Sequence, residues 1–264
     1  MSRQRQRGAE AFADELRAAR EPFVVATVVW TRGRGSAKAG DRAVISASGA
    51  VRGWIGGACS FDTVRREGGH ALASGRPRVL CIGTPDDFPA PSDERVVERA
   101  TCASEGSYEI FLEPHLPAAQ LVVLGDSPLA ATLSELGVTL GYDVAWGRRA
   151  DPAAGTRARA LDGADLSALT VDDRTFIVVA TQGSWDLDAL RAALVTDAPY
   201  VALVASARRW SRLRARLTRE LGEGAVERVR APAGLDLGPV PHEEIAVAIL
   251  AEIIREKAAR TRAG

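Results

Sequence analysis

The residues best suited to chemistry lie in a short turn that carries a cysteine just behind two glycines. Gly56, Gly57 and Cys59 stand between an apolar stretch at residues 50–55 and a helical pattern that starts at Phe61. Glycine lets a backbone approach a ligand closely, and free amides at a helix start attract anions. A thiol there is more readily held as thiolate. The turn therefore suits an oxyanion, a soft metal or sulfur transfer, although a tight turn with a buried cysteine has the same pattern.

A second loop and a second cysteine could serve the same site. Residues 32–42 are rich in glycine and arginine and include Lys38, so the loop could close over a phosphate or a pterin, or form a solvated approach to a hairpin. Cys102 precedes an apolar stretch. Thiolates favour soft ions such as Cu(I), which makes Cys59 and Cys102 candidate metal ligands if the fold brings them together. Cys81 lies within an apolar strand pattern and is expected in the core.

The stretch from Gly125 to Ala130 stands where a dinucleotide phosphate loop would stand. Compared with the pattern G-x-G-x-x-G, it keeps Gly125, has Ser127 in place of the second glycine, and has an acceptable Ala130 in place of the third. After the next strand, an NAD site needs an acid, and this sequence has Arg148, which could accept a 2′-phosphate instead. The pattern predicts a dinucleotide-type fold that either binds NAD(P) or FAD or serves as a scaffold without them.

Two further segments near the C-terminus carry candidate ligand-binding residues. Ser206 is suited to cap a helix, and Arg209 in its first turn could clamp a phosphate or simply face solvent. Gly234 and Asp236 lie in a tight loop that leads into the last helix. Neither segment defines a reaction by itself.

The hydrophobic periodicity predicts an α/β protein of two domains. Residues 1–115 read as an α+β domain that contains the Gly-Gly-x-Cys turn, and residues 118–264 as a Rossmann-like, doubly wound parallel sheet, with a proline-containing linker at 113–117. The expected helices are 10–19, 61–73, 129–140, 186–195, 208–220 and 242–260. The expected strands are 23–31, 43–45, 50–55, 78–82, 108–112, 120–124, 143–146, 175–181 and 200–204.

Composition narrows the function classes. The 264 residues carry 34 basic and 34 acidic side chains, so no net field attracts nucleic acid or an anionic membrane. Three cysteines are an odd number and imply no disulfide framework. No apolar run approaches the roughly 20 residues that span a bilayer. We therefore expect a cytoplasmic protein without a membrane span or a nucleic-acid partner.

In this order, these segments resemble the XdhC/CoxI family over residues 23–254. The most specific parts are residues 53–59 and 234–254, and residues 102–114 are similar to the CoxI branch. The resemblance implies a chaperone that binds molybdenum cofactor, as molybdopterin or its cytosine dinucleotide form, and delivers it to an apo molybdenum hydroxylase such as xanthine dehydrogenase or aerobic CO dehydrogenase. It also implies that Gly56, Gly57 and Cys59 handle the cofactor and that Gly125 forms the Rossmann turn.

The sequence departs from the family pattern and leaves three hypotheses. Gln182 stands where the family has histidine, and the acid after the second Rossmann strand is missing. The first hypothesis is a maturation factor in which Cys59 is the candidate catalytic residue, working with a sulfur donor such as a cysteine desulfurase and forming a homodimer. The second is an oxidoreductase that uses NAD(P) or FAD. The third is a copper or sulfur delivery factor for a Mo–Cu CO dehydrogenase, which uses Cys59 with Cys102.

Overall fold

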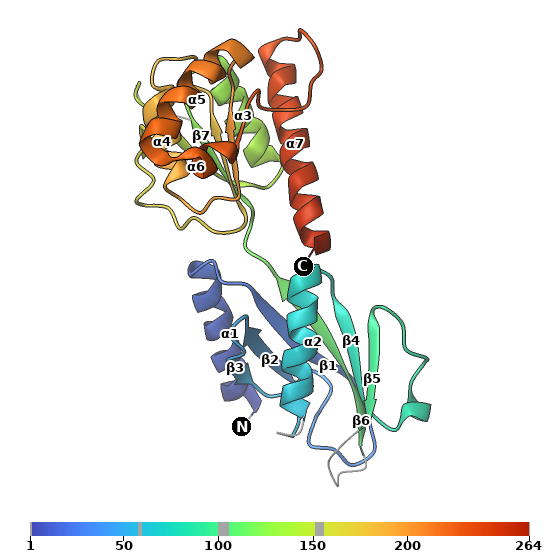
Figure 1. Cartoon of the computed structure of the whole chain (residues 1–264). Coiled ribbons are helices and arrows are strands. Elements are labelled where there is room, and N and C mark those ends of the chain that lie inside the picture. The colour runs from blue at the N-terminus through green and yellow to red at the C-terminus, as the bar shows by residue number, and fades with distance from the viewer. Residues whose placement is uncertain (1, 58–59, 100–105, 151–155, 264) are drawn as a thin grey trace. The chain divides into compact units, whose positions relative to one another are not determined.

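The computed structural model describes residues 2–57, 60–99, 106–150 and 156–263. The chain forms two compact units, residues 1–117 and 118–260, here called the N-terminal unit and the Rossmann unit (Figure 1). The N-terminal unit contains α1 (Ser2–Ala18), β1 (Phe23–Arg32), β2 (Arg42–Ser46), β3 (Val51–Gly53), α2 (Phe61–Ser74), β4 (Arg78–Gly83), a 3₁₀ turn η2 (Pro85–Asp87), β5 (Arg95–Arg99) and β6 (Ser107–His115).

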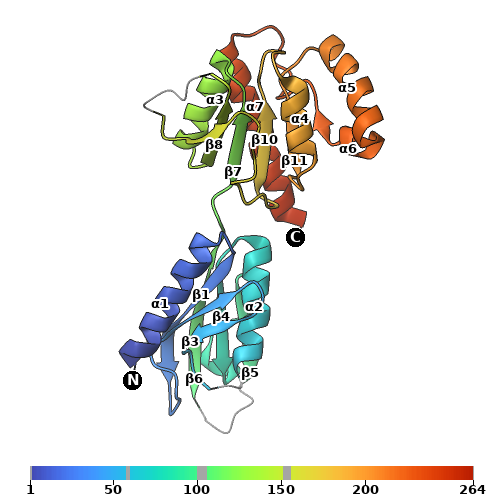
Figure 2. The ribbon, with the colours of Figure 1, turned by 90° about the vertical axis from the view of Figure 1, so that its left-hand side faces the viewer.

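The N-terminal unit is a mixed sheet with one helix on each face. Its strand order is β3-β2-β1-β6-β4-β5, and among these neighbours only β4 and β5 run parallel. Helices α1 and α2 lie on opposite sides of the sheet (Figure 2). Side chains alternate along β1, so that Phe23 packs with α1 while Val24 and Ala26 pack with α2. Gly75 ends α2 with a left-handed φ of 64°. The sheet and α2 therefore anchor the two ends of the segment between β3 and α2, of which residues 54–57 and 60 are described.

Two features of this unit differ from the sequence-based expectation. Strand β5 was not predicted, because Val96 and Val97 are its only apolar residues and charged residues flank them. The strand lies at the edge of the sheet, where charged side chains are common. Strand β6 continues to His115 through the stretch interpreted as a linker. Pro114 is tolerated because β4 pairs with β6 only as far as Leu112, so at Pro114 the strand has β1 as its one neighbour.

The Rossmann unit is a six-stranded parallel sheet between two layers of helices. Its elements are β7 (Gln120–Leu124), α3 (Pro128–Thr139), β8 (Asp143–Arg148), β9 (Arg159–Asp162), β10 (Thr175–Val179), α4 (Asp186–Leu194), β11 (Tyr200–Leu203), α5 (Ala207–Leu221), α6 (Glu223–Glu227), β12 (Val229–Arg230) and α7 (His242–Ala263). The strand order is β9-β8-β7-β10-β11-β12, which is the order 3-2-1-4-5-6 of dinucleotide-binding sheets.

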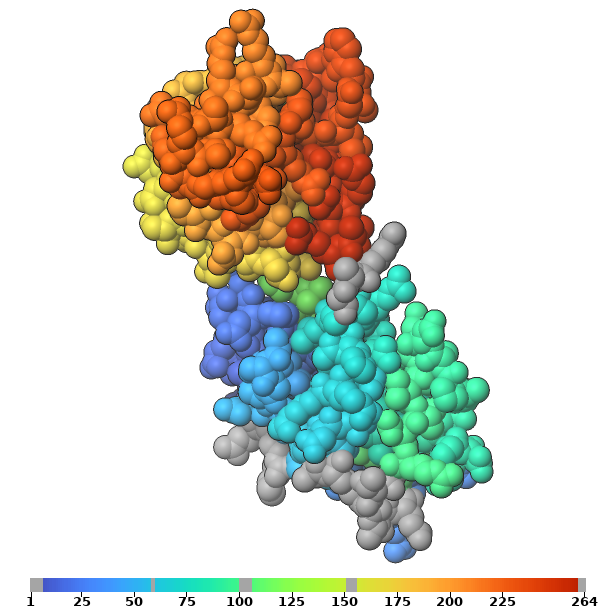
Figure 3. Space-filling view, viewed as in Figure 1, coloured from blue at the N-terminus to red at the C-terminus, as the bar shows by residue number. Residues whose placement is uncertain are grey.

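The core of the Rossmann unit lies on both faces of this sheet. Its strands are almost continuously apolar, as expected when both faces are covered. Helices α3 and α7 pack on one face, and α4, α5 and α6 pack on the other (Figure 2). Helices α5 and α6 form much of this unit's visible outer surface (Figure 3), and Leu217 is the one buried residue of α5. The predicted α/β class with a Rossmann-like sheet is confirmed.

The strand order places one edge of the sheet where ligands bind in such folds. The order reverses between β7 and β10, and ligands of open parallel sheets bind beyond the carboxyl ends of the strands at that point. Within the described residues, no helix is long and apolar enough to cross a membrane.

Candidate functional site

The predicted turn of the N-terminal unit needs its glycines. A side chain on Gly53, at the end of β3, would clash with the carbonyl group of Arg42, and its φ is 112°. Gly56 has a φ of 123°, and a Cβ there would lie 3.4 Å from both Ala37 Cβ and the Tyr108 hydroxyl oxygen. The Ser60 hydroxyl donates to the Gly57 carbonyl oxygen at 2.7 Å. The described part of the turn is thus held by backbone conformation at Gly53 and Gly56 and by close packing.

Three segments that are distant in sequence meet around this turn. Ala37 and Tyr108 both approach Gly56, and a Cβ on Gly106 would lie 3.1 Å from the Cα of Gly35. Lys38 follows Ala37; it is exposed, and its backbone N–H donates to the Asp41 carboxylate at 2.8 Å. The loop at 33–41, the glycine turn and the start of β6 therefore lie next to one another; a joint role of Lys38, Gly56 and Gly57 in binding stays a prediction.

Two of the three cysteines, Cys59 and Cys102, lie outside the described residues. Among the residues that are described, no cluster of three or more His, Cys, Asp or Glu side chains could hold a metal ion. Cys81 is fully buried in β4, as expected from the sequence, with its sulfur 3.6 Å from a carboxylate oxygen of Glu109. Burial, and then the charge of Glu109, raise the pKa of the Cys81 thiol to about 11. Cys81 is therefore an inert thiol.

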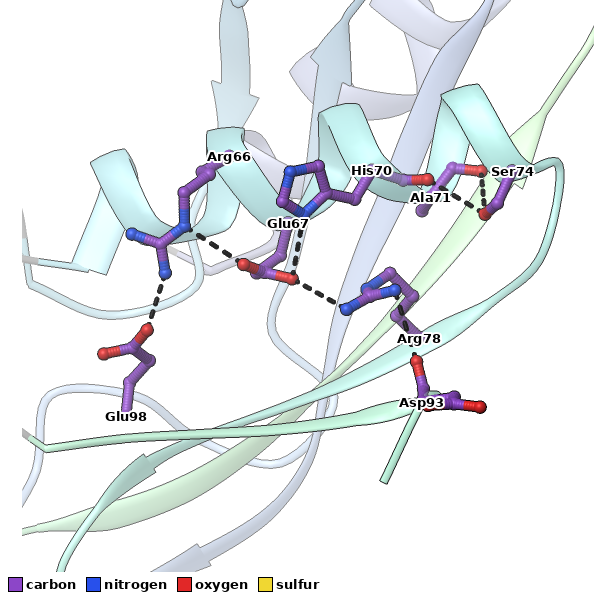
Figure 4. A network of polar contacts seen from close by, with 8 residues as sticks. All are labelled: Arg66, Glu67, His70, Ala71, Ser74, Arg78, Asp93 and Glu98. Atoms are coloured by element: carbon purple, nitrogen blue, oxygen red, sulfur yellow. Dashed lines mark hydrogen bonds and ion pairs between the residues drawn. The ribbon is translucent and has the colours of Figure 1, made fainter. Parts of the chain in front are cut away.

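A buried carboxylate on α2 ties the helix to the adjoining strands (Figure 4). Glu67 is 3% exposed and accepts from Arg66 Nε at 3.1 Å, while Arg78 of β4 lies 3.1 Å away and His70 3.5 Å away. Arg66 also donates to Glu98 of β5 at 2.6 Å. Burial alone would raise the pKa of Glu67, but the hydrogen bond from Arg66 and the charge of Arg78 outweigh it and lower the pKa. We interpret this network as structural support for α2.

The Rossmann unit contains a cavity of about 660 Å³ at the carboxyl edge of its sheet. Its walls are the turns after β7, β10 and β11, the loop after β12 and the first turns of α7. A volume of this size suits a small organic ligand. Apolar side chains dominate the walls, among them Leu129, Val204, Leu235 and Ile245.

Five of the predicted ligand-binding residues line this one cavity. They come from three separate segments and are Ser127, Ser206, Arg209, Gly234 and Asp236. Gly125 and Arg148 do not line it. A side chain on Gly125 would clash with the carbonyl group of Ala180, so this glycine serves the close approach of two loops. The Arg148 guanidinium lies over the Trp146 ring, 4.1 Å from its centroid.

Arg209 is held at the cavity by a buried acid. Its Nε lies 3.1 Å from a carboxylate oxygen of Asp186, which is 3% exposed, and Nη2 donates to the Val204 carbonyl oxygen. Asp186 in turn accepts from the Thr181 hydroxyl. Ser206 caps α5 by accepting from the Arg209 amide at 3.3 Å. An arginine has five N–H donors, so Arg209 keeps donor capacity for a ligand anion.

The loop after β12 is fixed by a second buried acid. Glu252 of α7 is 7% exposed, and its Oε2 accepts from the Tyr200 hydroxyl and from the Gly234 amide, each at 2.8 Å. Gly234 has a φ of 93°, and a Cβ there would lie 3.1 Å from Ile249. Asp236 accepts from the Gly238 amide at 3.0 Å. These contacts hold the loop against α7 as one wall of the cavity.

Sequence reasoning missed three residues of this site. Gln182 lines the cavity with a left-handed φ of 56°, and its side-chain amide makes no hydrogen bond to the rest of the described chain. His242 also lines the cavity, next to Glu243 at 3.2 Å. Glu252 supports it from behind. An acid within the apolar repeat of the last helix was the available signal for Glu252, because a buried carboxylate needs donors.

The fold and the cavity define a class of protein: a Rossmann unit with a ligand cavity at its strand ends, preceded by a mixed-sheet unit with a glycine turn. The XdhC and CoxI family model matches residues 16–83, and the XdhC Rossmann domain model matches residues 121–253. The chain belongs to the XdhC family.

One curated protein and one solved structure are similar to this chain. Uncharacterized protein YqeB of Escherichia coli strain K12 is 27% identical over 247 residues, which cover 89% of this chain and 44% of that protein. The chain thus spans less than half the length of this relative. A crystal structure titled a xanthine dehydrogenase (BH1974), from Bacillus halodurans, is 15% identical, with a TM-score of 0.45 and 96% coverage of both chains.

Proposed function

We propose that this protein is a maturation factor that binds molybdenum cofactor and assists its sulfuration and insertion into an apo molybdenum hydroxylase. Membership of the XdhC family links the chain to the maturation of xanthine dehydrogenase-type enzymes. The observation that carries the proposal is the gathering of five predicted ligand-binding residues on one cavity of about 660 Å³. A Mo–Cu CO dehydrogenase as the partner enzyme is the second, less favoured candidate.

The residues of the cavity fit a flat heterocycle that carries a phosphate. Leu129 and Ile245 offer apolar walls for the ring, and the side-chain amide of Gln182 can pair with a ring edge. Ser206 and Arg209, at the start of the fifteen-residue helix α5, would hold the phosphate. When bound, the cofactor supplies the molybdenum centre that the partner hydroxylase uses for oxidation–reduction chemistry.

Cys59 has a separate role in this proposal. Its thiol would act as a soft ligand or as a relay for sulfur from a donor such as a cysteine desulfurase, since a thiolate is the reactive form. The support comes from the close packing of Gly56 against Ala37, in the loop of Lys38, and from the hydrogen bond of Ser60 to the Gly57 carbonyl oxygen. We further propose a cytoplasmic homodimer as the working form.

The cavity is tested by measuring bound pterin after purification of the full chain from cells that make molybdopterin. Arg209→Ala should lower the pterin content about tenfold, the equivalent of one lost charged hydrogen bond. The matched control is Arg208→Ala, because Arg208 is exposed and does not line the cavity. Equal pterin content in the two variants would contradict the placement of the cofactor, and no pterin in the native protein would contradict the function.

The thiol is tested in the same preparation by activation of the partner hydroxylase. Cys59→Ala should lower both the bound pterin and the active fraction of the partner. Replacing the inert Cys81 by alanine is the control for loss of a thiol in general. Normal partner activation by Cys59→Ala would show that this thiol does not take part.

A further inference from the structure

In the Rossmann unit, direct hydrogen bonds join the loop after β7 to the loop after β8. In dinucleotide-binding folds of this strand order, one nucleoside lies between these two loops, with its ribose held by a residue at the end of the second strand. Here one carboxylate oxygen of Asp126 accepts from the backbone amides of Arg149 and Ala150, at 3.0 and 2.9 Å. The space for that nucleoside is therefore closed by this chain's own groups.

The loop after β10, the strand that pairs with β7 on the side opposite β8, is also hydrogen-bonded to Asp126. The other carboxylate oxygen of Asp126 accepts from the indole N–H of Trp185 at 3.1 Å, and Trp185 is 5% exposed. The Arg149 guanidinium lies over the Trp185 ring and pairs with Asp188 at 2.7 Å. Both side chains of that ion pair are half exposed, so the pair contributes little free energy to the contact between the loops. The three hydrogen bonds of Asp126 are what close the groove, and we call Asp126, Arg149 and Trp185 the latch.

At the start of α3, where a pyrophosphate would bind, this chain's own Ser127 side chain takes up the hydrogen-bonding position. Pro128 has no amide hydrogen, and the Ala130 amide donates to the Ser127 hydroxyl oxygen at 3.1 Å. The same hydroxyl donates to the Ala180 carbonyl oxygen at 2.7 Å. Ser127 thus stands where the second glycine of the dinucleotide pattern would leave room for the ligand.

The other half of the groove is open, because the cavity lies beyond β10, β11 and β12 and reaches the turn after β7 at Ser127 and Leu129. We infer that the Rossmann unit accepts a heterocycle with a single phosphate-bearing arm and that the latch excludes the nucleoside at the far end of a dinucleotide, namely the adenosine of NAD(P) or FAD or the cytidine of a cytosine dinucleotide cofactor. This deepens the proposed function and rests on it only for the identity of the ligand. The latch residues become the determinants of specificity for the shorter ligand.

The test combines amide hydrogen exchange and binding measurements on the full chain. In the free protein, the amides of Arg149 and Ala150 should exchange slowly, and Asp126→Ala should release them. NAD⁺ and FAD at millimolar concentration should leave the wild-type exchange pattern unchanged. The double variant Asp126→Ala/Arg149→Ala should bind FAD about tenfold more tightly than the wild type, whereas Asp188→Asn, which removes only the surface ion pair, should not.

Several results would overturn the latch. Fast exchange of both amides in the wild type would show that the closure does not exist in solution. Tight FAD or NAD⁺ binding with new protection at residues 126 and 149–150 would show that the groove accepts a dinucleotide. If the double variant binds FAD no more tightly than the wild type, the latch is not what excludes the dinucleotide. Molybdopterin is the separate probe for the proposed function: if it leaves residues 204–209 and 231–240 unprotected, that function fails while the latch is still decided by the other measurements.

Discussion

Removal of the Glu252 carboxylate should destabilise the Rossmann unit and loosen one wall of its cavity. Glu252 is buried on α7 and serves two donors at 2.8 Å, the Tyr200 hydroxyl of β11 and the Gly234 amide of the loop after β12. Arg230 lies 3.7 Å from its other oxygen. Burial, followed by the hydrogen bond to Glu252, raises the pKa of Tyr200, so this hydroxyl remains a donor throughout the ordinary pH range.

The magnitude follows from the two donors. In Glu252→Ala, both lose their acceptor inside the protein, and each unsatisfied buried donor costs about 1–3 kcal/mol. We therefore expect the free energy of unfolding to fall by about 4 kcal/mol. Tyr200→Phe removes one hydrogen bond to a charged group and should cost about 2 kcal/mol in the wild type. In the Glu252→Ala background, it should cost nothing or restore stability, because it removes an orphaned hydroxyl.

The assay is urea unfolding of the four proteins of this double-mutant cycle, followed by tryptophan fluorescence. Trp146, Trp185 and Trp210 report on the Rossmann unit. The control is Glu256→Ala, because Glu256 lies one turn further along α7 and pairs with the same Arg230 at 2.8 Å. This ion pair is partly exposed and should contribute about 1 kcal/mol. Equal costs of Tyr200→Phe in both backgrounds would refute the coupling. So would a Glu252→Ala variant as stable as Glu256→Ala.

Two further predictions concern the N-terminal unit. The pKa of Glu67 is lowered in the folded protein, so its ionised form stabilises the fold above the ordinary pKa of 4.5, and this stabilisation is lost as the pH falls through the folded value. Glu67→Gln should therefore cost about 2 kcal/mol at neutral pH, and the difference from wild type in urea unfolding should shrink in acid; a gap independent of pH would contradict this reasoning. With a pKa of about 11 for Cys81, roughly one thiol in a thousand is ionised at pH 8. Peptide mapping after iodoacetamide treatment should find Cys81 unmodified in the native chain and modified in urea, and rapid native labelling would show that its burial is wrong.

The sequence predicted most of the Rossmann unit because local pattern and final packing agree there. The stretch at Gln120–Leu124 is apolar throughout and became the central strand β7, and the helix expected at 186–195 became α4 (Asp186–Leu194). Short elements were missed for a physical reason. Strand β12 has only two residues, Val229 and Arg230, and pairs only with β11. Its existence is decided by the tertiary structure rather than by its own pattern.

For the site, the sequence predicted which loops matter better than which side chains. Ser206 and Arg209 reach the cavity because they begin a helix that follows a parallel strand, which is a local property. Gly125 was interpreted as ligand-binding but is packed against Ala180, a contact between segments 55 residues apart that no local pattern contains. The supporting acids Asp186 and Glu252 were missed for the same reason, since their partners come from other elements.

The missing second glycine and the missing acid after β8, the two departures from the dinucleotide pattern, have the same structural consequence. A second glycine would leave room for a pyrophosphate, and an acid after β8 would hold a ribose. In this chain, Ser127 fills the first space and bonds to Ala180, while Asp126 fills the second and bonds to the amides of residues 149 and 150. A scaffold that had simply lost its ligand would leave buried polar groups without partners, at a cost in stability. Because the Ser127 hydroxyl and the Asp126 carboxylate are paired within the chain, the closed half of the groove is a built feature that excludes the longer ligand, and the open half is where the shorter ligand would bind.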